Sequence, residues 1–304
     1  MILIDTHCDT LSVMAGYGDE INVPEQIITP DRLRAGGVTL QVAAIFAGDK
    51  GPAPNGEPAV WARNQLAAIP GFTDGGIAQI KEFSDVKEGI PSFILSIEGG
   101  EVLEGSLDTL QRYYDIGVRM CALTWNFENE LGFPHCHESE KPLKPFGWDC
   151  VREMNRLGVA VDVSHLGLGG FWDLIEHADK PPMASHSCCM ALQPKMTRNL
   201  SDDQIKAMIE RGGWIGMNFC SSFLVEGRRA TVEDIADQIE HIAKLGGIKH
   251  VGFGSDFDGI PVNPEGLEDP SRFPNMLDTL RKRFSEAEVE GIAGLNFLEY
   301  VKRL

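Results

Sequence analysis

Short apolar runs alternate with amphipathic stretches along most of the chain. Several runs are almost continuous in apolar residues, which is typical of parallel strands that are covered on both faces of a sheet. We predict eight strands, at residues 2–5, 38–46, 92–97, 119–124, 160–164, 183–185, 214–218 and 251–254. Eight strands that alternate with helices over 304 residues are the elements of a (β/α)8 TIM barrel. A doubly wound open sheet is the alternative, but it usually has a glycine-rich turn after its first strand, and residues 6–10 contain no glycine.

The amphipathic stretches carry recognisable helix starts. Thr231 is a predicted N-cap, and Gly246-Gly247 is placed to end the helix that follows it. The apolar stripe of that helix is Val232, Ile235, Ile239 and Ile242. Capping boxes also begin at Ser201 and Ser285. Because no linker or low-complexity segment divides the chain, we expect residues 1–304 to form a single catalytic domain.

The composition fits a folded protein with a sizeable core, since 43% of the residues are hydrophobic and 24% are charged. The 27 Lys and Arg residues against 45 Asp and Glu residues give a net charge of −18. A surface of that sign repels phosphate backbones and anionic lipids. We therefore expect neither nucleic acid nor a membrane as a partner.

The chain also lacks the patterns of targeting signals. Its first residues have no basic region and reach a charge at Asp5 before an apolar segment can form. No apolar stretch approaches the roughly 18 residues that span a bilayer. The seven cysteines form no Cys-x-x-Cys pair, which favours reduced thiols and a cytoplasmic location.

Barrel enzymes carry their chemistry at the carboxyl ends of the strands, and five of the eight predicted strands end in candidate metal ligands. These candidates are His7 and Asp9, Glu98, His165, His186, and Asp256. Imidazole and carboxylate groups are the ligands that zinc and similar divalent ions take. Each residue taken alone has an ordinary structural explanation, such as a turn for an Asp. Their occurrence together at one rim of the barrel predicts a metal site.

The pair His7 and Asp9 and the single residue Glu98 support this site most strongly. His7 and Asp9 form a His-x-Asp pair, and alternate residues of an extended segment point to the same face. Glu98 follows an apolar run and precedes two glycines. A carboxylate buried there needs a cation or another partner, because an unpaired buried charge is costly.

The remaining histidines fit a metal site less well. His177 and His241 lie off the apolar stripes of their helices, which predicts exposure to solvent. His250 precedes the last strand, on the opposite rim of the barrel. His135 and His137 form a His-x-His pair in a long segment, for which we expect a polar surface loop with at most a minor role, such as in a lid.

Six segments of the chain form a recognisable set. They are Asp5-Thr6-His7-Cys8-Asp9, Ile97-Glu98-Gly99-Gly100, Val163-Ser164-His165, Ser185-His186-Ser187, Arg198-Asn199 and Gly254-Ser255-Asp256-Phe257-Asp258-Gly259. In this order they resemble the renal (membrane) dipeptidase family of zinc peptidases, peptidase family M19, in its soluble bacterial type. The resemblance covers nearly the whole chain, and its His-x-Asp start and Gly-x-Asp-Phe-Asp-Gly end are specific when they occur together.

The resemblance implies a metal-dependent hydrolase of the amidohydrolase-like type, with two Zn²⁺ ions in a (β/α)8 barrel. The ligands that it implies are His7 and Asp9 for one ion, His165 and His186 for the other, and Glu98 between both. It places Asp256 beside the bridging water as proton acceptor and donor. It also implies that Arg198 holds the free carboxylate of a dipeptide, which suits the forked guanidinium.

One position departs from the family. Members often carry a His after the Leu-Thr of the fourth strand, where it helps to bind the substrate, whereas here Leu123-Thr124 is followed by Trp125. An indole can pack and donate a hydrogen bond, but it cannot act as an imidazolium. We expect Trp125 and the nearby Asn129 to belong to the substrate site, with an altered substrate preference.

These observations lead us to expect a cytoplasmic dipeptidase with Glu98 and Asp256 as its catalytic residues, in which water held between two zinc ions attacks the peptide bond. Its partners would be small dipeptides, and the resemblance suggests a homodimer, although the sequence shows no dimer stripe.

Two alternatives stay open. One is hydrolysis of an N-acyl amino acid, a lactam or a lactone on the same metals. Related barrels often begin His-x-His and bridge their metals with a modified lysine, and this chain has neither feature at its strand ends. The other alternative is a metal-binding protein without hydrolytic activity, which would leave Arg198 and Asp256 unexplained.

Overall fold

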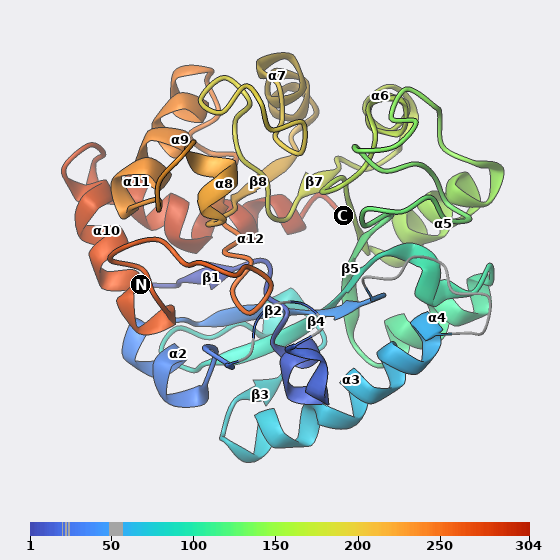
Figure 1. Ribbon diagram of the computed structural model, residues 1–304, viewed down its shortest axis with the longest axis horizontal. Coiled ribbons are helices and arrows are strands. Elements are labelled where there is room, and N and C mark those ends of the chain that lie inside the picture. Colours follow the sequence, from blue (N-terminus) through green and yellow to red (C-terminus); the bar gives the residue numbers. More distant parts are fainter. Residues whose placement is uncertain (20, 22, 24, 49–56) are drawn as a thin grey trace.

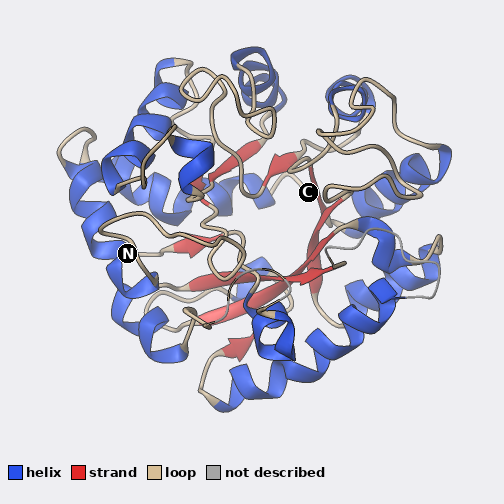
Figure 2. Ribbon diagram, in the orientation of Figure 1, coloured by secondary structure: helices blue, strands red, loops and turns tan. Residues whose placement is uncertain are grey.

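Eight parallel strands form a closed ring that is surrounded by helices (Figure 1, Figure 2). The structure is a computed structural model that describes residues 1–19, 21, 23, 25–48 and 57–304. The strands of the ring are β1 (Ile4–Asp5), β2 (Leu40–Phe46), β4 (Ser92–Glu98), β5 (Val118–Ala122), β6 (Ala160–Asp162), β7 (Met183–Ala184), β8 (Trp214–Met217) and β9 (Val251–Phe253). The ring closes because β1 pairs with both β2 and β9, and β2 also pairs with β4.

This closed ring confirms the predicted (β/α)8 barrel and excludes the open sheet. All eight predicted strands are present, and each end lies within two residues of its predicted place. The predicted strand at 160–164 ends early because the backbone N–H of Ser164 leaves the ladder and donates to the side chain of Asp162. A further strand, β3 (Ala78–Gln79), pairs with the start of β4. The sequence did not predict it, since two residues leave no apolar run.

Most helices lie outside the ring, and three of them begin at the predicted start signals. The helices are α1 (Thr10–Ser12), α2 (Pro30–Gly36), α3 (Glu57–Asp74), α4 (Leu107–Asp115), α5 (Pro145–Leu157), α6 (Leu168–His177), α7 (Asp202–Arg211), α8 (Ser221–Leu224), α9 (Val232–Lys244), α10 (Phe273–Arg281), α11 (Glu286–Glu290) and α12 (Asn296–Val301). Capping boxes at Ser201, Thr231 and Ser285 start α7, α9 and α11. Across the described residues, no helix combines the length and the apolar character that crossing a lipid bilayer requires.

The amino-terminal end of the barrel interior is filled with apolar side chains. One buried cluster joins strand residues to the last helix, α12, through Ile4, Leu40, Val42, Ile94, Met120, Ala160, Met183, Trp214, Phe297 and Tyr300. Residues from seven strands can meet in this way only inside the ring. Because this end is packed, the polar side chains of the interior gather at the carboxyl ends of the strands.

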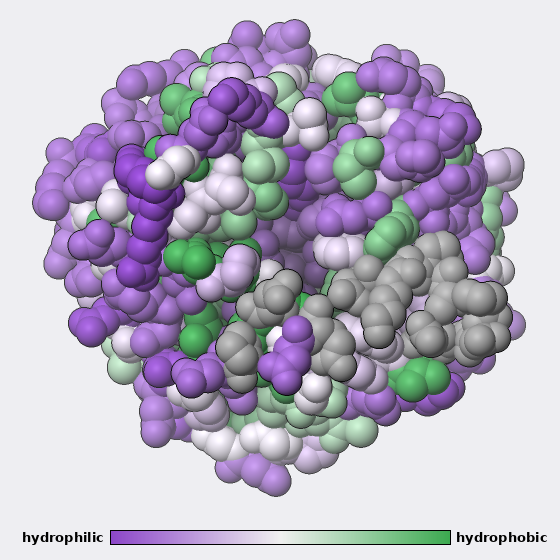
Figure 3. All heavy atoms as spheres, viewed as in Figure 1, coloured by the Kyte–Doolittle hydropathy of each residue, from purple (hydrophilic) through white to green (hydrophobic). Residues whose placement is uncertain are grey.

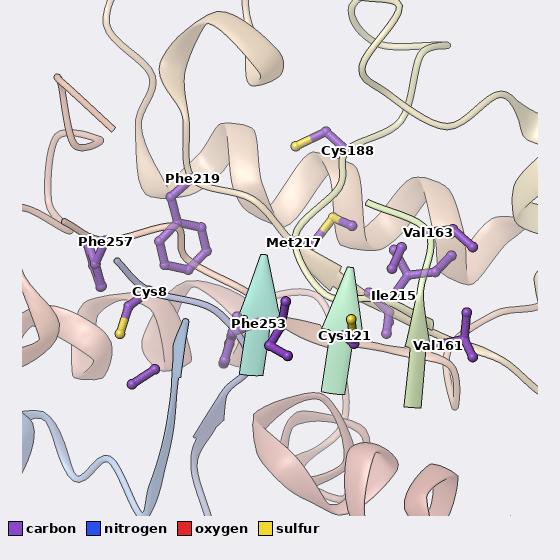
Figure 4. Packing of buried hydrophobic residues seen from close by; sticks show 14 of the residues in the cluster. Cys8, Cys121, Val161, Val163, Cys188, Ile215, Met217, Phe219, Phe253 and Phe257 are labelled. Carbon is purple, nitrogen blue, oxygen red and sulfur yellow. The ribbon is translucent and has the colours of Figure 1, made fainter. Parts of the chain in front are cut away.

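A larger cluster joins the strands to the surrounding helices. Figure 4 shows its part near the carboxyl ends of the strands, where Phe219, Phe253 and Phe257 lie close together. The ring of Phe219 packs edge-on against Phe257, with the ring centroids 5.5 Å apart. These contacts anchor the segment after β9, which carries Asp256.

Candidate metal centre

The side chains that the sequence predicts as metal ligands come together at the carboxyl ends of the strands. His7 and Asp9 follow β1, Glu98 ends β4, His165 follows β6, and His186 follows β7. All five residues are buried, with exposed fractions between 0% and 8%. Their ligand atoms and those of Asp256 form two groups, each within 4.8 Å: His7, Glu98 and His186, and His7, Asp9 and Asp256. The structure therefore contains a buried His/Glu group that can bind a metal ion.

Glu98 lies in the middle of this group. Its Oε1 is 3.2 Å from Nε2 of His165 and 3.4 Å from Nε2 of His186. Its Oε2 is 3.5 Å from Nε2 of His7. One carboxylate thus faces histidines on both sides.

His7 joins the two halves of the group. Its Nε2 lies 3.4 Å from Oδ2 of Asp9 and 3.8 Å from Oδ1 of Asp256. Its ring stacks on that of His186, with the centroids 3.8 Å apart. Nε2 of His7 and Oδ1 of Asp9 are buried and have no hydrogen-bond partner among the described residues.

The other two histidine rings are oriented through their Nδ1 atoms. Nδ1 of His165 is 2.9 Å from Oδ1 of Asn126, and Nδ1 of His186 is 2.7 Å from Oγ of Ser185. Metal-binding histidines usually have such a partner at the second ring nitrogen, because it fixes the tautomer and the ring orientation. Both Nε2 atoms are thereby left to face Glu98.

The electrostatics of the group favour a positive charge at its centre. Burial, with the charge of Arg198, lowers the pKa of His165 to about 3. Burial opposes a charge on Glu98, but His7 and the hydrogen bonds from the histidines outweigh it and hold the pKa of Glu98 well below its usual value. Burial raises the pKa of Asp256 to about 8, and the charges of Asp9 and Glu98 act in the same direction. The three carboxyl groups of this buried group can all be ionised near neutral pH only when a cation lies among them.

Backbone strain marks two of these residues. His165 has a φ of 68° and Asp256 has a φ of 64°, in the left-handed region that residues other than glycine rarely adopt. Such strain persists where the surrounding structure holds it, and it gathers at functional sites. Gly259 lies so close to the same group that a Cβ atom there would come within 2.1 Å of Oδ2 of Asp9.

A pocket of about 280 Å³ opens beside the centre. It is lined by Asp9, Ile21, Phe46, Glu98, Trp125, Asn126, His165, Cys220, Phe223, Asp256, Gly259, Ile260 and Pro261. The molecule is hollowed near the centre of the face seen in Figure 3, and hydrophilic residues lie at the bottom of the hollow. Sites for drug-sized ligands usually have 300–1,000 Å³, so this pocket suits a smaller ligand.

The three predicted substrate residues are placed differently. Trp125 lines the pocket, with its ring packed edge-on against Phe46 at a centroid distance of 5.0 Å. Arg198 is 4% exposed and is not among the residues that line the pocket; its Nη1 donates to Oγ of Ser187 and its Nη2 donates to the carbonyl of His186. Asn129 does not line the pocket.

Asn129 instead holds its own loop together. Its amide group donates to the carbonyl of Leu123 and to Glu101, and its side-chain oxygen accepts the backbone N–H groups of Leu131 and Gly132. The pocket position belongs to Asn126, which the sequence analysis did not assign. The segment has no periodicity that could tell which of the two asparagines points inward.

Asn218 is another residue that the sequence analysis did not assign. Its Nδ2 donates to Oδ2 of Asp256 at 2.9 Å, and its Oδ1 accepts from the backbone N–H of Cys220. Its position in the sequence could have indicated a role, because Asn218 is a polar residue at the end of the otherwise apolar strand predicted at residues 214–218. Asn218 fixes one oxygen of Asp256 and leaves the other facing His7.

The remaining histidines lie outside the centre. His177 and His137 are exposed, with 63% and 64% of their side chains accessible. His250 binds the carbonyl of Gly213 before β8. The expected exposure of His241 is wrong, because only 21% of its side chain is accessible and Nε2 lies 2.7 Å from Asp202 of the neighbouring helix. His135 is half-buried, with its ring centroid 6.1 Å from that of His165.

A (β/α)8 barrel with a buried group of His and Glu ligands at the carboxyl ends of its strands defines the class of metal-dependent hydrolases. Within that class, a sequence model of the membrane dipeptidase family, peptidase family M19, matches residues 1–303. The chain belongs to this family of metallo-dipeptidases, as the sequence motifs predicted.

Known proteins agree with this assignment. An uncharacterized dipeptidase of Schizosaccharomyces pombe is 37% identical over 222 residues, which cover 69% of this chain and 52% of that protein. The matched region thus spans about half the length of that relative.

Two solved structures share the fold. A metallopeptidase of Rhodobacter sphaeroides, liganded with a phosphinate mimic of the dipeptide L-Ala-D-Ala, is 24% identical, with a TM-score of 0.90 and coverage of 100% of this chain and 99% of that chain. An amidohydrolase of Pseudomonas aeruginosa is 22% identical, with a TM-score of 0.80 and coverage of 94% and 98%. These likenesses confirm the amidohydrolase-like barrel.

Proposed function

We propose that the chain is a metal-dependent dipeptidase that works as one catalytic domain. The observation that carries this proposal is the buried group of His7, Glu98 and His186 beside a pocket of about 280 Å³. Membership of the membrane dipeptidase family supports the same activity, as does the dipeptide mimic bound by the metallopeptidase of Rhodobacter sphaeroides. The homodimer and the cytoplasmic location stay predictions from the sequence.

The proposed centre holds two zinc ions. The donor set of imidazoles and carboxylates suits zinc, and the unpartnered Nε2 of His7 and Oδ1 of Asp9 support a cation there. A buried polar group without a partner costs about 1–3 kcal/mol, which a metal bond would remove. His7 and Asp9 would hold one ion and His165 and His186 the other. Glu98 would bind both, since its two oxygens face different histidines.

Metal ions bound there would lower the pKa of a shared water and polarise the carbonyl of the scissile bond. Residues of the chain would do the remaining work. Asp256 lies in the pocket wall, and Asn218 fixes its Oδ2. Its Oδ1 would accept a proton from the attacking water and return it to the leaving amine, which is the role of a general acid and base.

Arg198 would bind the free carboxylate of the dipeptide. Its two Nη atoms are held by Ser187 and the carbonyl of His186, while its buried Nε has no partner among the described residues. Its guanidinium lies 5.8 Å from the ring of Phe223, which lines the pocket. A fixed positive charge at this place attracts a carboxylate although the chain as a whole carries −18. Trp125 and Phe46 would pack against a substrate side chain.

The test is hydrolysis by protein that has been stripped with a chelator and then titrated with zinc. We expect turnover of L,L and L,D dipeptides only with added metal, and loss of turnover when the amino terminus is acetylated. Glu98→Gln should lose both metal and activity, while Glu210→Gln, on the exposed end of α7, should keep both. Hydrolysis that survives metal removal would refute the proposal, and a preference for N-acetylated substrates would favour the acylase alternative.

A further inference from the structure

Two buried carboxylates beneath the metal centre have no role in the proposed chemistry. Asp5 is the last residue of β1 and Asp162 is the last residue of β6. Their exposed fractions are 0% and 3%. A carboxylate buried this deeply is costly unless hydrogen bonds satisfy it, so the donors around each one show what it does.

Asp162 joins the ends of β6 and β7. Its Oδ1 accepts two backbone N–H groups, from Ser164 and from Ser185, both at 2.9 Å. Ser164 directly precedes His165, and Ser185 directly precedes His186. One oxygen atom therefore fixes the backbone immediately before both histidines of one half of the proposed centre.

Asp5 makes the equivalent connection between the ends of β1 and β9. Its Oδ1 accepts the backbone N–H groups of Ser255 at 2.8 Å and of His7 at 3.4 Å. Its Oδ2 accepts the hydroxyl of Ser255 at 2.6 Å. Ser255 directly precedes Asp256. This carboxylate thus fixes the backbone at His7 and at Asp256, in the other half of the proposed centre.

The connection from Asp162 continues to a histidine ring. Every polar group of Ser185 is engaged: the N–H by Asp162, the carbonyl by the hydroxyl of Thr6 at 2.7 Å, and Oγ by Nδ1 of His186 at 2.7 Å. Because Ser185 is held at its N–H and at its carbonyl, its Oγ can hold the ring of His186 in one orientation, with Nε2 of that ring toward Glu98. Hydrogen bonds to a carboxylate are about twice as strong as neutral ones, which suits them to this purpose.

We propose that Asp5 and Asp162 are positioning residues of the metal centre, each of which sets the geometry of one half through the serine that follows the neighbouring strand. The inference rests on the proposed function in that the centre binds metal ions. Partners outside the first shell of ligands typically change metal affinity or activity by 10–100-fold. A purely structural role would change the stability of the barrel and leave metal affinity unchanged.

The test measures zinc affinity by competition with a chelating dye, and the visible spectrum of the cobalt-substituted protein, which reports ligand geometry. Asp162→Ala should lower zinc affinity about 10–100-fold and change the cobalt spectrum. Asp162→Asn should restore most of the affinity, because its amide oxygen can still accept both backbone N–H groups. The same contrast is expected between Asp5→Ala and Asp5→Asn.

Two further variants complete the design. Asp173→Ala is the matched control. Asp173 also accepts a backbone N–H, that of Leu143 at a distance of 2.8 Å, but it lies outside the metal centre. This variant should keep full zinc affinity. Ser185→Ala leaves the backbone N–H donation to Asp162 in place but removes the partner of His186, and it should lower affinity about 10-fold. It keeps the proposal testable if Asp162→Ala does not fold.

Unchanged zinc affinity and cobalt spectrum in folded Asp162→Ala or Ser185→Ala would overturn the proposal, even if the melting temperature falls. Failure of the proposed function gives a different result. A wild-type protein that binds zinc but hydrolyses no dipeptide would refute the dipeptidase, while the metal-affinity comparison would still decide the role of Asp5 and Asp162.

Discussion

The Nε2 atoms of His165 and His186 lie 3.0 Å apart, at the ends of two neighbouring strands. Each ring has its Nδ1 beside an oxygen of Asn126 or Ser185, so that in the tautomer that binds a metal ion Nδ1 donates to this oxygen and Nε2 carries the lone pair. Burial lowers the pKa of both imidazoles, which keeps them neutral. Two lone pairs that face each other at this distance repel, and a cation between them would remove the repulsion.

We therefore predict that zinc stabilises the folded chain. Binding to the native state alone adds about 2.7 kcal/mol when the free metal is at 100 times its dissociation constant. Calorimetry of chelator-treated protein with and without zinc should show this gain, and a chelator should reverse it. Glu98→Gln should abolish most of the gain, because it replaces the carboxylate that faces three histidines. An equal gain in that variant would contradict a metal site at Glu98.

The two asparagines after β5 should separate function from stability. Asn126→Ala removes the partner of His165 Nδ1 and should lower zinc affinity and activity about 10–100-fold with little loss of stability. Asn129→Ala leaves the carbonyl of Leu123 and the N–H groups of Leu131 and Gly132 without their partner. It should cost about 2–4 kcal/mol of unfolding free energy, with normal zinc affinity in the folded fraction. Urea unfolding and zinc titration of both variants measure the two effects. A loss of zinc affinity in Asn129→Ala, with a loss of stability in Asn126→Ala, would contradict the prediction.

The sequence predicts those parts of the structure that depend on local pattern. Strands such as β2 and β4 are buried along their whole length, so their apolar runs are visible in the sequence. That the candidate ligands come together could be predicted because a strand end has a known place in a barrel. The capping box of Thr231 gives the start of α9 for the same local reason.

What the sequence could not show depends on contacts between distant segments. His241 lies off the apolar stripe of α9, but Asp202 approaches it from α7, and no pattern within α9 contains that information. The loop after β5 has no period, so the sequence could not show that Asn126 points into the pocket while Asn129 supports the loop. The roles of Asp5 and Asp162 likewise arise only when neighbouring strands are joined.

Glu101 should make stability depend on pH. Burial raises the pKa of this carboxyl to about 7, with Asn129 as its hydrogen-bond donor. In the unfolded chain a Glu titrates near pH 4.3. Between these values the folded state holds the proton more tightly than the unfolded state, so the free energy of unfolding falls as pH rises, by up to about 4 kcal/mol in total.

Replacement by Gln removes this titration. The free energy of unfolding of Glu101→Gln, relative to that of the wild-type protein, should therefore rise by about 3 kcal/mol from pH 5 to pH 8. Urea unfolding at both values, in the presence of a chelator so that metal binding does not contribute, measures the difference. If the two proteins differ in unfolding free energy by the same amount at pH 5 and at pH 8, Glu101 ionises freely in the folded chain and the prediction is wrong.

Trp125 should determine how tightly a substrate is held rather than how fast it reacts. Its ring lines the pocket and packs against Phe46 and Phe127, with centroid distances of 5.0 Å and 5.6 Å. Its ring centroid lies 6.2 Å from that of His165, so it neighbours the centre without being one of the proposed ligands. Contact with an apolar wall is made in both the ground state and the transition state, and loss of such uniform binding raises KM with kcat unchanged.

We predict that Trp125→Ala raises KM for dipeptides with apolar side chains about 10-fold, which corresponds to about 1.4 kcal/mol, while kcat and zinc affinity stay near wild type. Trp125→Phe should keep most of the affinity, because an aromatic wall remains. Trp172→Ala, on α6 and outside the pocket, controls for the loss of a tryptophan as such. Steady-state kinetics on a series of dipeptides decides the matter. A fall in kcat at constant KM would instead make the indole a participant in the chemical step.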